Sequence, residues 1–282
     1  QTHDAPVAGL PSEWEGGVVA LLADLQVGMW WDNTGMVEKA VARALDADPD
    51  LVLIAGDFVY KPDSATVREA VALVAPLTAA SAPVVAVFGN HDYSLSKRDD
   101  EPRLDLASYL TSELEAAGVT VLDNQAVAVG GDPESDAGPG LWVAGFGSEW
   151  AGRSRPVETL VTVPPGAARI ALMHNPVAFR EIPAGSRVLS LAAHTHGGQV
   201  RLPLLPSESW LDIARDREVV ADGWAADSIG HAGNHLYVNR GLGFSGVPLR
   251  IMCKPELTLF VLRAADERDV DDATEAGEPG TG

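Results

Sequence analysis

The chain has 282 residues, of which 46% are hydrophobic, and it carries a formal charge of −20 at pH 7. This composition supplies a sizeable core for one large α/β domain or two small ones, and it excludes a mostly disordered chain. No apolar run approaches the ~20 residues that span a bilayer, and the negative charge without a Lys/Arg cluster argues against long nucleic acid as a partner.

The cysteine content and the first residue bear on location. The single cysteine, Cys253, excludes an internal disulfide and a thiolate metal cluster, and it fits a reducing compartment or an exported protein without disulfides. The chain begins with Gln1 rather than Met, so we expect that an upstream signal peptide or membrane anchor has been removed. We therefore expect a soluble protein as given, exported or membrane-anchored through the removed segment, or otherwise cytoplasmic.

The first half of the chain alternates buried strands and amphipathic helices. Three short apolar runs bounded by turn residues predict strands at 18–23, 51–56 and 84–89. Apolar residues at helical spacing predict helices at 34–48, 64–80 and 105–118. We expect Thr34 and Ser64 to cap the first two helices and Gly118 to end the third. This alternation predicts a mainly parallel sheet with right-handed crossovers.

The second half is rich in strands and poor in helices. Strands are expected within "VTVLDN", "AVAVGG", "LWVAGFG", "RIALMH", "RVLSLAAH" and the C-terminal "PLRIMCKPELTLFVLR", which suggests a second sheet packed on the first. Residues 130–140 read as an exposed turn or insertion. We divide the chain into an N-terminal extension (1–16), a single domain (17–263) and a disordered acidic tail (264–282).

Polar side chains follow five of the apolar strands, at the point where each strand ends. In an open α/β sheet, ligands bind just beyond the carboxyl ends of the strands, so these side chains describe one site. They are Asp24 and Gln26; Asp57 and Tyr60; Asn90, His91 and Asp92; His174; and His194 and His196.

This set of side chains indicates a metal site. Carboxylate, amide oxygen and imidazole without thiolate suit Mn, Fe or Zn. The ligands are too many for one tetrahedral ion, and two ions about 3.5–4 Å apart would use them all.

Each of these residues also has a structural explanation when taken alone. An Asp after a strand is most often a helix cap, and a lone His174 is more often a hydrogen-bonded core histidine. The Asn-His-Asp run at 90–92 has no packing value after a buried strand, and the ordered set of five strand ends outweighs the separate explanations. His3, His231 and His235 lie in no such context, and we take them as surface or structural residues.

The blocks "DLQ", "GDFVY", "GNHD", "MHNP" and "AHTHGGQ" resemble the calcineurin-like metallophosphoesterases. Over residues 18–262, "GGQVRLP", "YVNRGLG" and "VPLRIMCKPELTLFVL" are also similar to a branch of small bacterial phosphodiesterases that often carry an N-terminal membrane segment. The resemblance implies an α/β class, four-layer α/β/β/α sandwich of two mixed sheets flanked by helices. It also implies a dinuclear centre on the loops at the strand ends.

Carried over residue by residue, the resemblance implies a role for each ligand. Asp57 would bridge two ions, with Asp24 and His196 on the first. The second ion would take Asn90, His174 and His194. A hydroxide between the ions is the expected nucleophile.

The same resemblance implies the proton chemistry. His91 is the expected general acid for the leaving oxygen, with Asp92 orienting it and supporting its cationic form.

Gln26 departs from the family, which has a histidine at this position of its D-x-H motif. The amide could mark a weakly active site, or it could coordinate through its oxygen, as implied by similarity to family members with D-x-Q. Alternatively, "GDFVY" resembles the G-D-x-x-Y of purple acid phosphatases, so that Tyr60 would bind Fe(III) as a phenolate beside a divalent ion. Tyr60 could equally pack over the site or touch substrate.

We expect a dinuclear metal-dependent hydrolase acting on a phosphodiester or pyrophosphate of a small or lipid-linked substrate. The alternatives are a phosphomonoesterase of purple-acid-phosphatase type and a non-catalytic metal-binding module, although His91 and Asp92 argue against the module. Trp30 and Trp31 would lie at the rim, where exposed indoles suit a nucleobase, an acyl chain or peripheral membrane contact, unless they cap the core. The sequence does not indicate an oligomeric state.

Overall fold

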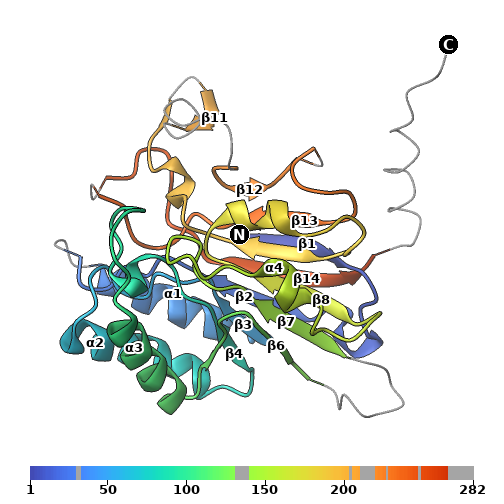
Figure 1. Ribbon diagram of the computed structural model, residues 1–282, viewed down its shortest axis with the longest axis horizontal. Helices are drawn as coiled ribbons and strands as arrows, with labels where there is room; N and C mark the ends of the chain where they lie inside the picture. The colour runs from blue at the N-terminus through green and yellow to red at the C-terminus, as the bar shows by residue number, and fades with distance from the viewer. Residues whose placement is uncertain are drawn as a thin grey trace.

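Two six-stranded sheets pack face to face, with helices on both outer sides (Figure 1). This computed structural model describes residues 1–29, 33–130, 140–202, 205–209, 220–226, 228–246 and 249–265. Trp30 and Trp31, most of the 130–140 insertion and the acidic tail beyond residue 265 lie outside these ranges.

The first sheet has the strand order β1-β14-β2-β3-β4-β5. Strands β2 to β5 are parallel to one another, and β14 joins their edge antiparallel to β2 and parallel to β1. The strand bounds are β1 Thr2–Val7, β2 Val18–Leu22, β3 Leu51–Ile54, β4 Val84–Ala86, β5 Thr120–Val121 and β14 Thr258–Ala264.

The second sheet has the order β12-β13-β9-β8-β7-β6. Its four central strands are parallel, and both edge strands run antiparallel to their neighbours. The bounds are β6 Gln125–Ala128, β7 Leu141–Gly145, β8 Ala168–Leu172, β9 Leu189–Ala192, β12 Gly223–Trp224 and β13 His235–Val238. A separate hairpin joins β10 (Arg201–Leu202) and β11 (Leu205–Ser209).

Three apolar clusters separate four layers. The first lies between the first sheet and helices α1 (Thr34–Asp46), α2 (Ser64–Thr78) and α3 (Leu104–Ala116). The second fills the space between the two sheets, and the third packs α4 (Pro156–Leu160) and the 3₁₀ helix η3 (Pro176–Glu181) against the second sheet. Shorter 3₁₀ helices are η1 (Ser12–Trp14), η2 (His91–Tyr93) and η4 (His196–Gly198). The predicted α/β/β/α sandwich of mixed sheets is confirmed.

Two strands predicted for the second sheet belong to the first. β5 returns after α3 to pair in parallel with β4, and β14 pairs with β2. β5 is half-buried at most, and β14 alternates buried and half-buried residues, so the apolar pattern identifies each strand but not the sheet that it joins.

The predicted helix caps are also corrected. The N-cap of α1 is Asn33, without a side-chain capping bond, rather than Thr34. The N-cap of α2 is Asp63 rather than Ser64, and its carboxylate accepts from the amides of Ala65 and Thr66 in a capping box. Gly118 follows α3 with φ +92°, which is the left-handed position expected where a helix ends.

The first residues of the chain are part of the first sheet. Strand β1 buries Ala5 and Val7 in the cluster between the sheets, and the Gln1 ammonium donates to the Leu257 carbonyl at 2.8 Å. Residues before position 17 therefore add an edge strand to the domain that was predicted to begin there.

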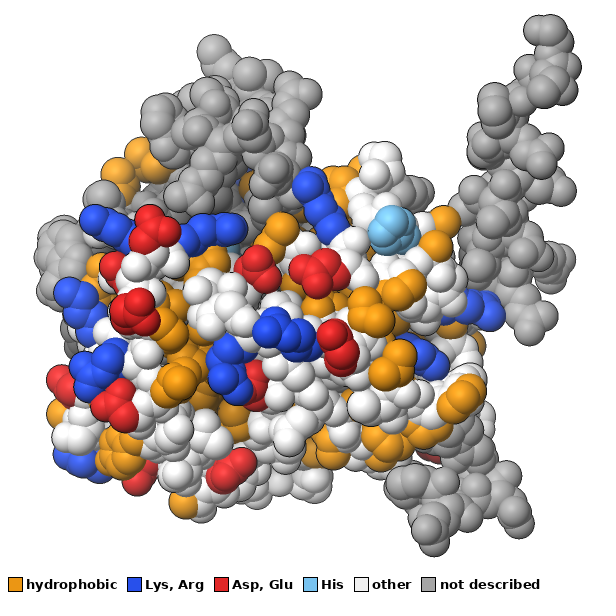
Figure 2. All heavy atoms as spheres, in the orientation of Figure 1, with side chains coloured by type: hydrophobic (Ala, Val, Ile, Leu, Met, Phe, Trp, Pro, Cys, Tyr) orange, Lys and Arg blue, Asp and Glu red, His pale blue; other side chains and the backbone are white. Residues whose placement is uncertain are grey.

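The outer surface carries charges of both signs. On the face shown in Figure 2, acidic and basic side chains are interspersed among apolar ones. Among the described helices, none has the length and hydropathy that a membrane span requires.

Candidate metal centre

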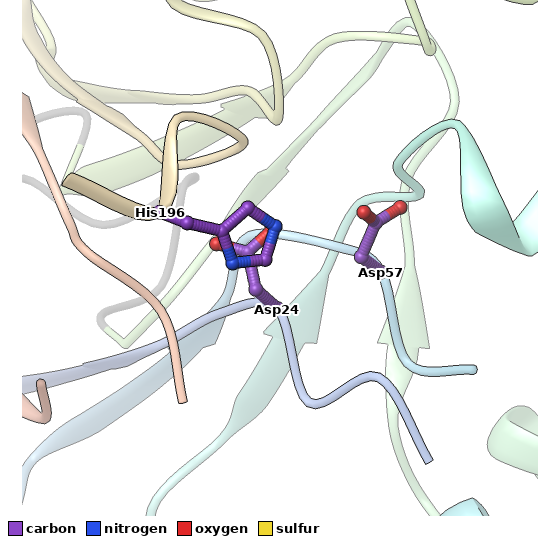
Figure 3. A group of neighbouring side chains, drawn as sticks. All are labelled: Asp24, Asp57 and His196. Atoms are coloured by element: carbon purple, nitrogen blue, oxygen red, sulfur yellow. The ribbon is translucent and has the colours of Figure 1, made fainter. Parts of the chain in front are cut away.

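The strand ends of both sheets converge on one group of side chains. β2, β3 and β4 lead into the loops that carry Asp24, Asp57 and Asn90, while β8 and β9 lead to His174 and His194. Ligand atoms of Asp24, Asp57 and His196 all lie within 4.8 Å of one another, and these side chains come from three separate loops (Figure 3). Parallel strands of packed sheets thus bring together residues that are far apart in the sequence.

Several of these residues adopt left-handed backbone conformations that side chains other than glycine rarely take. The φ values are +49° for Asp24, +53° for Gln26, +57° for Asp57, +74° for His194 and +52° for His196. Each costs on the order of 1–3 kcal/mol and persists only where the surroundings enforce it. Such conformations cluster at functional sites, because they turn a side chain sharply toward a shared point.

Asp57 lies at the centre of the group. One carboxylate oxygen accepts from the Gln26 amide at 2.8 Å and lies 3.3 Å from His174 Nε2, while the other accepts from the His91 backbone amide at 2.8 Å. A Cβ on Gly89 would overlap both Asp57 and His174, so glycine is required there. Asp57 therefore contacts residues of three different loops, through Gln26, His91 and His174.

Main-chain contacts hold Asn90 and His174 in the group. The Asn90 side-chain amide donates to the Leu95 carbonyl at 3.0 Å, and His174 Nδ1 lies 2.7 Å from the Ala55 carbonyl. Because a carbonyl only accepts, His174 carries its hydrogen on Nδ1 and presents Nε2, which lies 3.2 Å from His194 Nδ1. The outer contacts thereby fix which atom each residue offers as a ligand.

Buried ligand atoms without hydrogen-bond partners collect here. Among the described residues these atoms are both carboxylate oxygens of Asp24, Gln26 Oε1, Asn90 Oδ1 and His196 Nδ1. Leaving a buried polar atom unpaired costs about 1–3 kcal/mol, and more for charged groups. Oxygen and imidazole donors left unpaired around two buried carboxylates fit divalent cations.

Burial and mutual charge shift the pKa values within the group. Burial, opposed in part by His174, raises the pKa of Asp24 to about 7. Burial alone would raise the pKa of Asp57, but His174 and His91 lower it below its ordinary value. Burial opposes the charged form of His174, yet Asp57 raises its pKa to about 9.

When no metal ion is bound, protons on Asp24 and His174 therefore offset the negative charge of the buried carboxylates. Burial, and next the nearby Arg250, hold the pKa of His196 well below 6.5, which leaves that imidazole neutral. A metal ion bound at His174 would displace its proton, so metal affinity would fall as the pH falls.

Asp92 joins two of the loops. Its buried carboxylate accepts from the backbone amides of Asp57, Phe58 and Gly89 at 2.8–2.9 Å and from Val59 at 3.3 Å. Burial, with the neighbouring charge of Asp57, raises its pKa to about 7. Asp92 thus ties the loops of Asp57 and Asn90 together, and its support of His91 stays a prediction.

His91 is oriented by Tyr60. His91 Nδ1 lies 2.9 Å from the Tyr60 carbonyl, and the two rings are stacked with centroids 4.9 Å apart. His91 therefore keeps its hydrogen on Nδ1 and its Nε2 available. Gln26 lies in the predicted group through its contact with Asp57, whereas the Tyr60 ring stacks on His91 and has Lys61 Nζ 5.9 Å from its centroid.

Three further residues belong to the surroundings of the centre, and the sequence reasoning missed them. Trp150, which follows β7, contacts His194 edge-to-face with centroids 5.1 Å apart, and Arg98 Cζ lies 5.7 Å from the indole centroid. Gly241 packs on Asp24, where a Cβ would overlap the carboxylate. Trp150 follows a strand end in "GFGSEW", which was the available signal, and Gly241 lies in "YVNRGLG", a block that the sequence analysis used only for its resemblance.

Comparisons with known proteins agree with this geometry. Residues 17–245 match the family model described as calcineurin-like phosphoesterase. Phosphodiesterase YaeI of Escherichia coli (strain K12) is 31% identical over 248 residues, covering 86% of this chain and 81% of the relative. The uncharacterized metallophosphoesterase YkuE of Bacillus subtilis (strain 168) is 28% identical, covering 94% of this chain and 85% of the relative.

Among solved structures, TT1561 of Thermus thermophilus aligns with a TM-score of 0.46 and 13% identity over 80% of this chain and 90% of that chain. The family match spans most of the chain and includes every residue predicted for the site. The chain therefore belongs to the calcineurin-like phosphoesterase family and is a phosphoric ester hydrolase.

Proposed function

We propose that the chain hydrolyses a phosphodiester or pyrophosphate bond of a small or lipid-linked substrate with the help of two metal ions. The observation that carries this proposal is the set of buried, unpaired ligand atoms around Asp57. The similarity to phosphodiesterase YaeI supports a diester rather than a monoester as the substrate.

The ligands divide into two groups that share Asp57. Asp24 and His196 would hold the first ion, and Gln26 Oε1, which is buried and unpaired, is available to it. The second ion would take Asn90, His174 and His194. The donors are oxygen and nitrogen, which suit Mn, Fe or Zn. Bound ions would supply a nucleophile at neutral pH and stabilise charge on the phosphoryl oxygens.

His91 acts as general acid in this proposal. Its Nδ1 is committed to the Tyr60 carbonyl, so Nε2 is the atom that would pass a proton to the leaving oxygen. The stacked Tyr60 ring restricts rotation of the imidazole, and the Tyr60 side chain is itself half-buried. We place Tyr60 here as support for His91; ligation of Fe(III) by its phenolate is the alternative that the third experiment below detects.

The rim offers two aromatic surfaces to a substrate. Tyr60 lies against His91 and Trp150 lies against His194, and both side chains are half-buried. Aromatic rings of this kind suit the apolar or flat part of a leaving group. The arrangement supports a substrate that extends beyond its phosphate, such as a lipid-linked diester.

The first prediction concerns the shared carboxylate. After loading with Mn²⁺, the wild type should hydrolyse bis-p-nitrophenyl phosphate faster than p-nitrophenyl phosphate. Asp57→Asn should lower this rate more than about 100-fold and reduce the bound metal, since even residues that only support a ligand are worth about 10–100-fold. Metal analysis and p-nitrophenolate release measure both quantities.

The matched control is Asp105→Asn, which alters an exposed aspartate paired with Arg103 and should leave both quantities unchanged. A faster monoester rate in the wild type would favour a phosphomonoesterase. Wild-type rate and metal content in Asp57→Asn would contradict a shared carboxylate, and an inactive metal-loaded wild type would indicate a non-catalytic module.

The second prediction concerns the proton. His91→Ala should keep its metal but lose about 10²–10⁴-fold in rate on diesters with poor, alkoxide leaving groups. The loss should be smaller for p-nitrophenolate, which leaves without protonation. Rates on a leaving-group series measure the effect, with His235→Ala, an exposed histidine, as the control. An equal loss across the series would show that His91 only positions the substrate.

The third prediction separates the two roles of Tyr60. Because its ring supports His91, Tyr60→Phe should retain the stacking and the backbone carbonyl and keep nearly full activity with Mn²⁺. The iron-loaded wild type should show no phenolate-to-metal absorption in the visible. A pink or purple iron form that Tyr60→Phe bleaches would instead establish phenolate ligation at the first ion.

A further inference from the structure

Arg250 is a half-buried arginine whose guanidinium contacts main-chain carbonyls. It donates to the carbonyls of His196 at 3.1 Å, Arg240 at 2.7 Å and Gly241 at 3.1 Å, and twice to Gly243 at 2.6 and 3.0 Å. Among the described residues, no carboxylate lies within ion-pair distance of it. Burial lowers the pKa of this guanidinium, so the carbonyl contacts replace the water that it has lost.

These carbonyls belong to the two loops that surround Asp24. One is the loop of His196, itself a proposed ligand. The other, residues 240–243, is bonded along the backbone of Asp24: Leu242 donates to the Ala23 carbonyl at 3.0 Å and Gly243 donates to the Asp24 carbonyl at 2.7 Å. Arg250 therefore joins the segment that braces Asp24 to the turn that presents His196.

The bracing segment reaches the side chains as well as the backbone. Cβ atoms placed on Gly241 and Gly243 would run into Asp24 and Gln26 respectively, so both glycines lie directly against the first half of the centre. A shift of residues 240–243 would therefore displace the groups that pack against Asp24 and Gln26. Cys253 supports the same turn, because its thiol lies 3.3 Å from the His196 carbonyl.

The backbone strain at the residues proposed to hold the first ion requires contacts from other segments to maintain it. Asp24, Gln26 and His196 all have left-handed φ values near +50°, which persist only where surrounding contacts enforce them. The planar guanidinium presents several N–H donors in a fixed fork and can serve carbonyls on both loops at once. A lysine ammonium, with three donors on a flexible stem, cannot reproduce that geometry.

We propose that Arg250 is a positioning residue for the first-ion half of the centre: it locks the loop of His196 to residues 240–243 and so holds Asp24 and His196 at ligand distance. This inference rests on the two-ion centre proposed above. It assigns Arg250 no contact with substrate. Of the proposed second-ion ligands, Asn90 and His174 are held by main-chain contacts outside the loops that Arg250 joins. His194 shares the loop of His196 but also packs against Trp150, so this half should survive the loss of Arg250.

The test is calorimetric titration of Mn²⁺ into chelator-treated protein, for the wild type, Arg250→Lys and the matched control Arg169→Lys. Arg169 also donates to main-chain carbonyls, those of Ala167 at 3.2 Å and Pro164 at 3.3 Å, but it lies outside the loops of the centre. The wild type and Arg169→Lys should bind two ions per chain. Arg250→Lys should bind one ion as tightly as the wild type, and bind the other at least about 10-fold more weakly.

Two further measurements separate positioning from stability. Metal-free Arg250→Lys should unfold at a temperature close to that of Arg169→Lys, and with one equivalent of Mn²⁺ it should give the spin-resonance spectrum of an isolated ion rather than a coupled pair. If Arg250→Lys does not fold, Arg250→Gln, which retains an amide donor, is titrated by the same criterion.

The outcomes distinguish this inference from the proposed function. Two tight ions in the wild type and also in the folded Arg250 variant would overturn the role of Arg250 and leave the two-ion centre intact. A wild type that binds fewer than two ions would overturn the two-ion centre, and this inference with it.

Discussion

Two buried carboxylates, Asp24 and Asp57, impose the constraint on which the rest of the centre depends. Both are at most 1% exposed, and their ligand atoms lie within 4.8 Å of each other and of His196. Like charges at this separation in a low-dielectric interior repel strongly unless cations neutralise them. Without metal ions, protons and the imidazole of His174 serve this purpose, as the raised pKa values of Asp24 and His174 show. The fold therefore contains an unfavourable arrangement of charges that bound metal ions would neutralise.

Main-chain contacts, more than side-chain pairs, keep this unfavourable arrangement in place. Asp92 accepts from four backbone amides and joins the loops after β3 and β4. Arg250 donates to four residues' carbonyls and joins the loops after β9 and β13. The Asp92 carboxylate thus accepts from backbone amides in one part of the centre, and the Arg250 guanidinium donates to backbone carbonyls in the other. Both act on strained loops at the strand ends, where the sheets themselves provide no further hydrogen bonds.

The sequence allowed the α/β class to be predicted from local patterns, and the same patterns supply the residues predicted for the site. Apolar runs of strand length located β2, β3 and β4, and the polar residues after them identified Asp24, Asp57 and Asn90. Sheet membership of β5 and β14 was not predictable from such runs, since an apolar run indicates a strand but not the neighbour with which it pairs. The roles of Asp92 and Arg250 were not predictable either, because their partners are backbone atoms, which carry no residue-specific signal. Asp63, the N-cap of α2 that the sequence analysis missed, is a further case, because its carboxylate also bonds to backbone amides.

Diffraction from crystals soaked in Mn²⁺, recorded at a wavelength where manganese scatters anomalously, tests the central claim most directly. The account predicts two anomalous peaks about 3.5–4 Å apart. One should contact Asp24 and His196, the other should contact Asn90, His174 and His194, and Asp57 should touch both. A single peak, or two peaks that Asp57 does not connect, would contradict it.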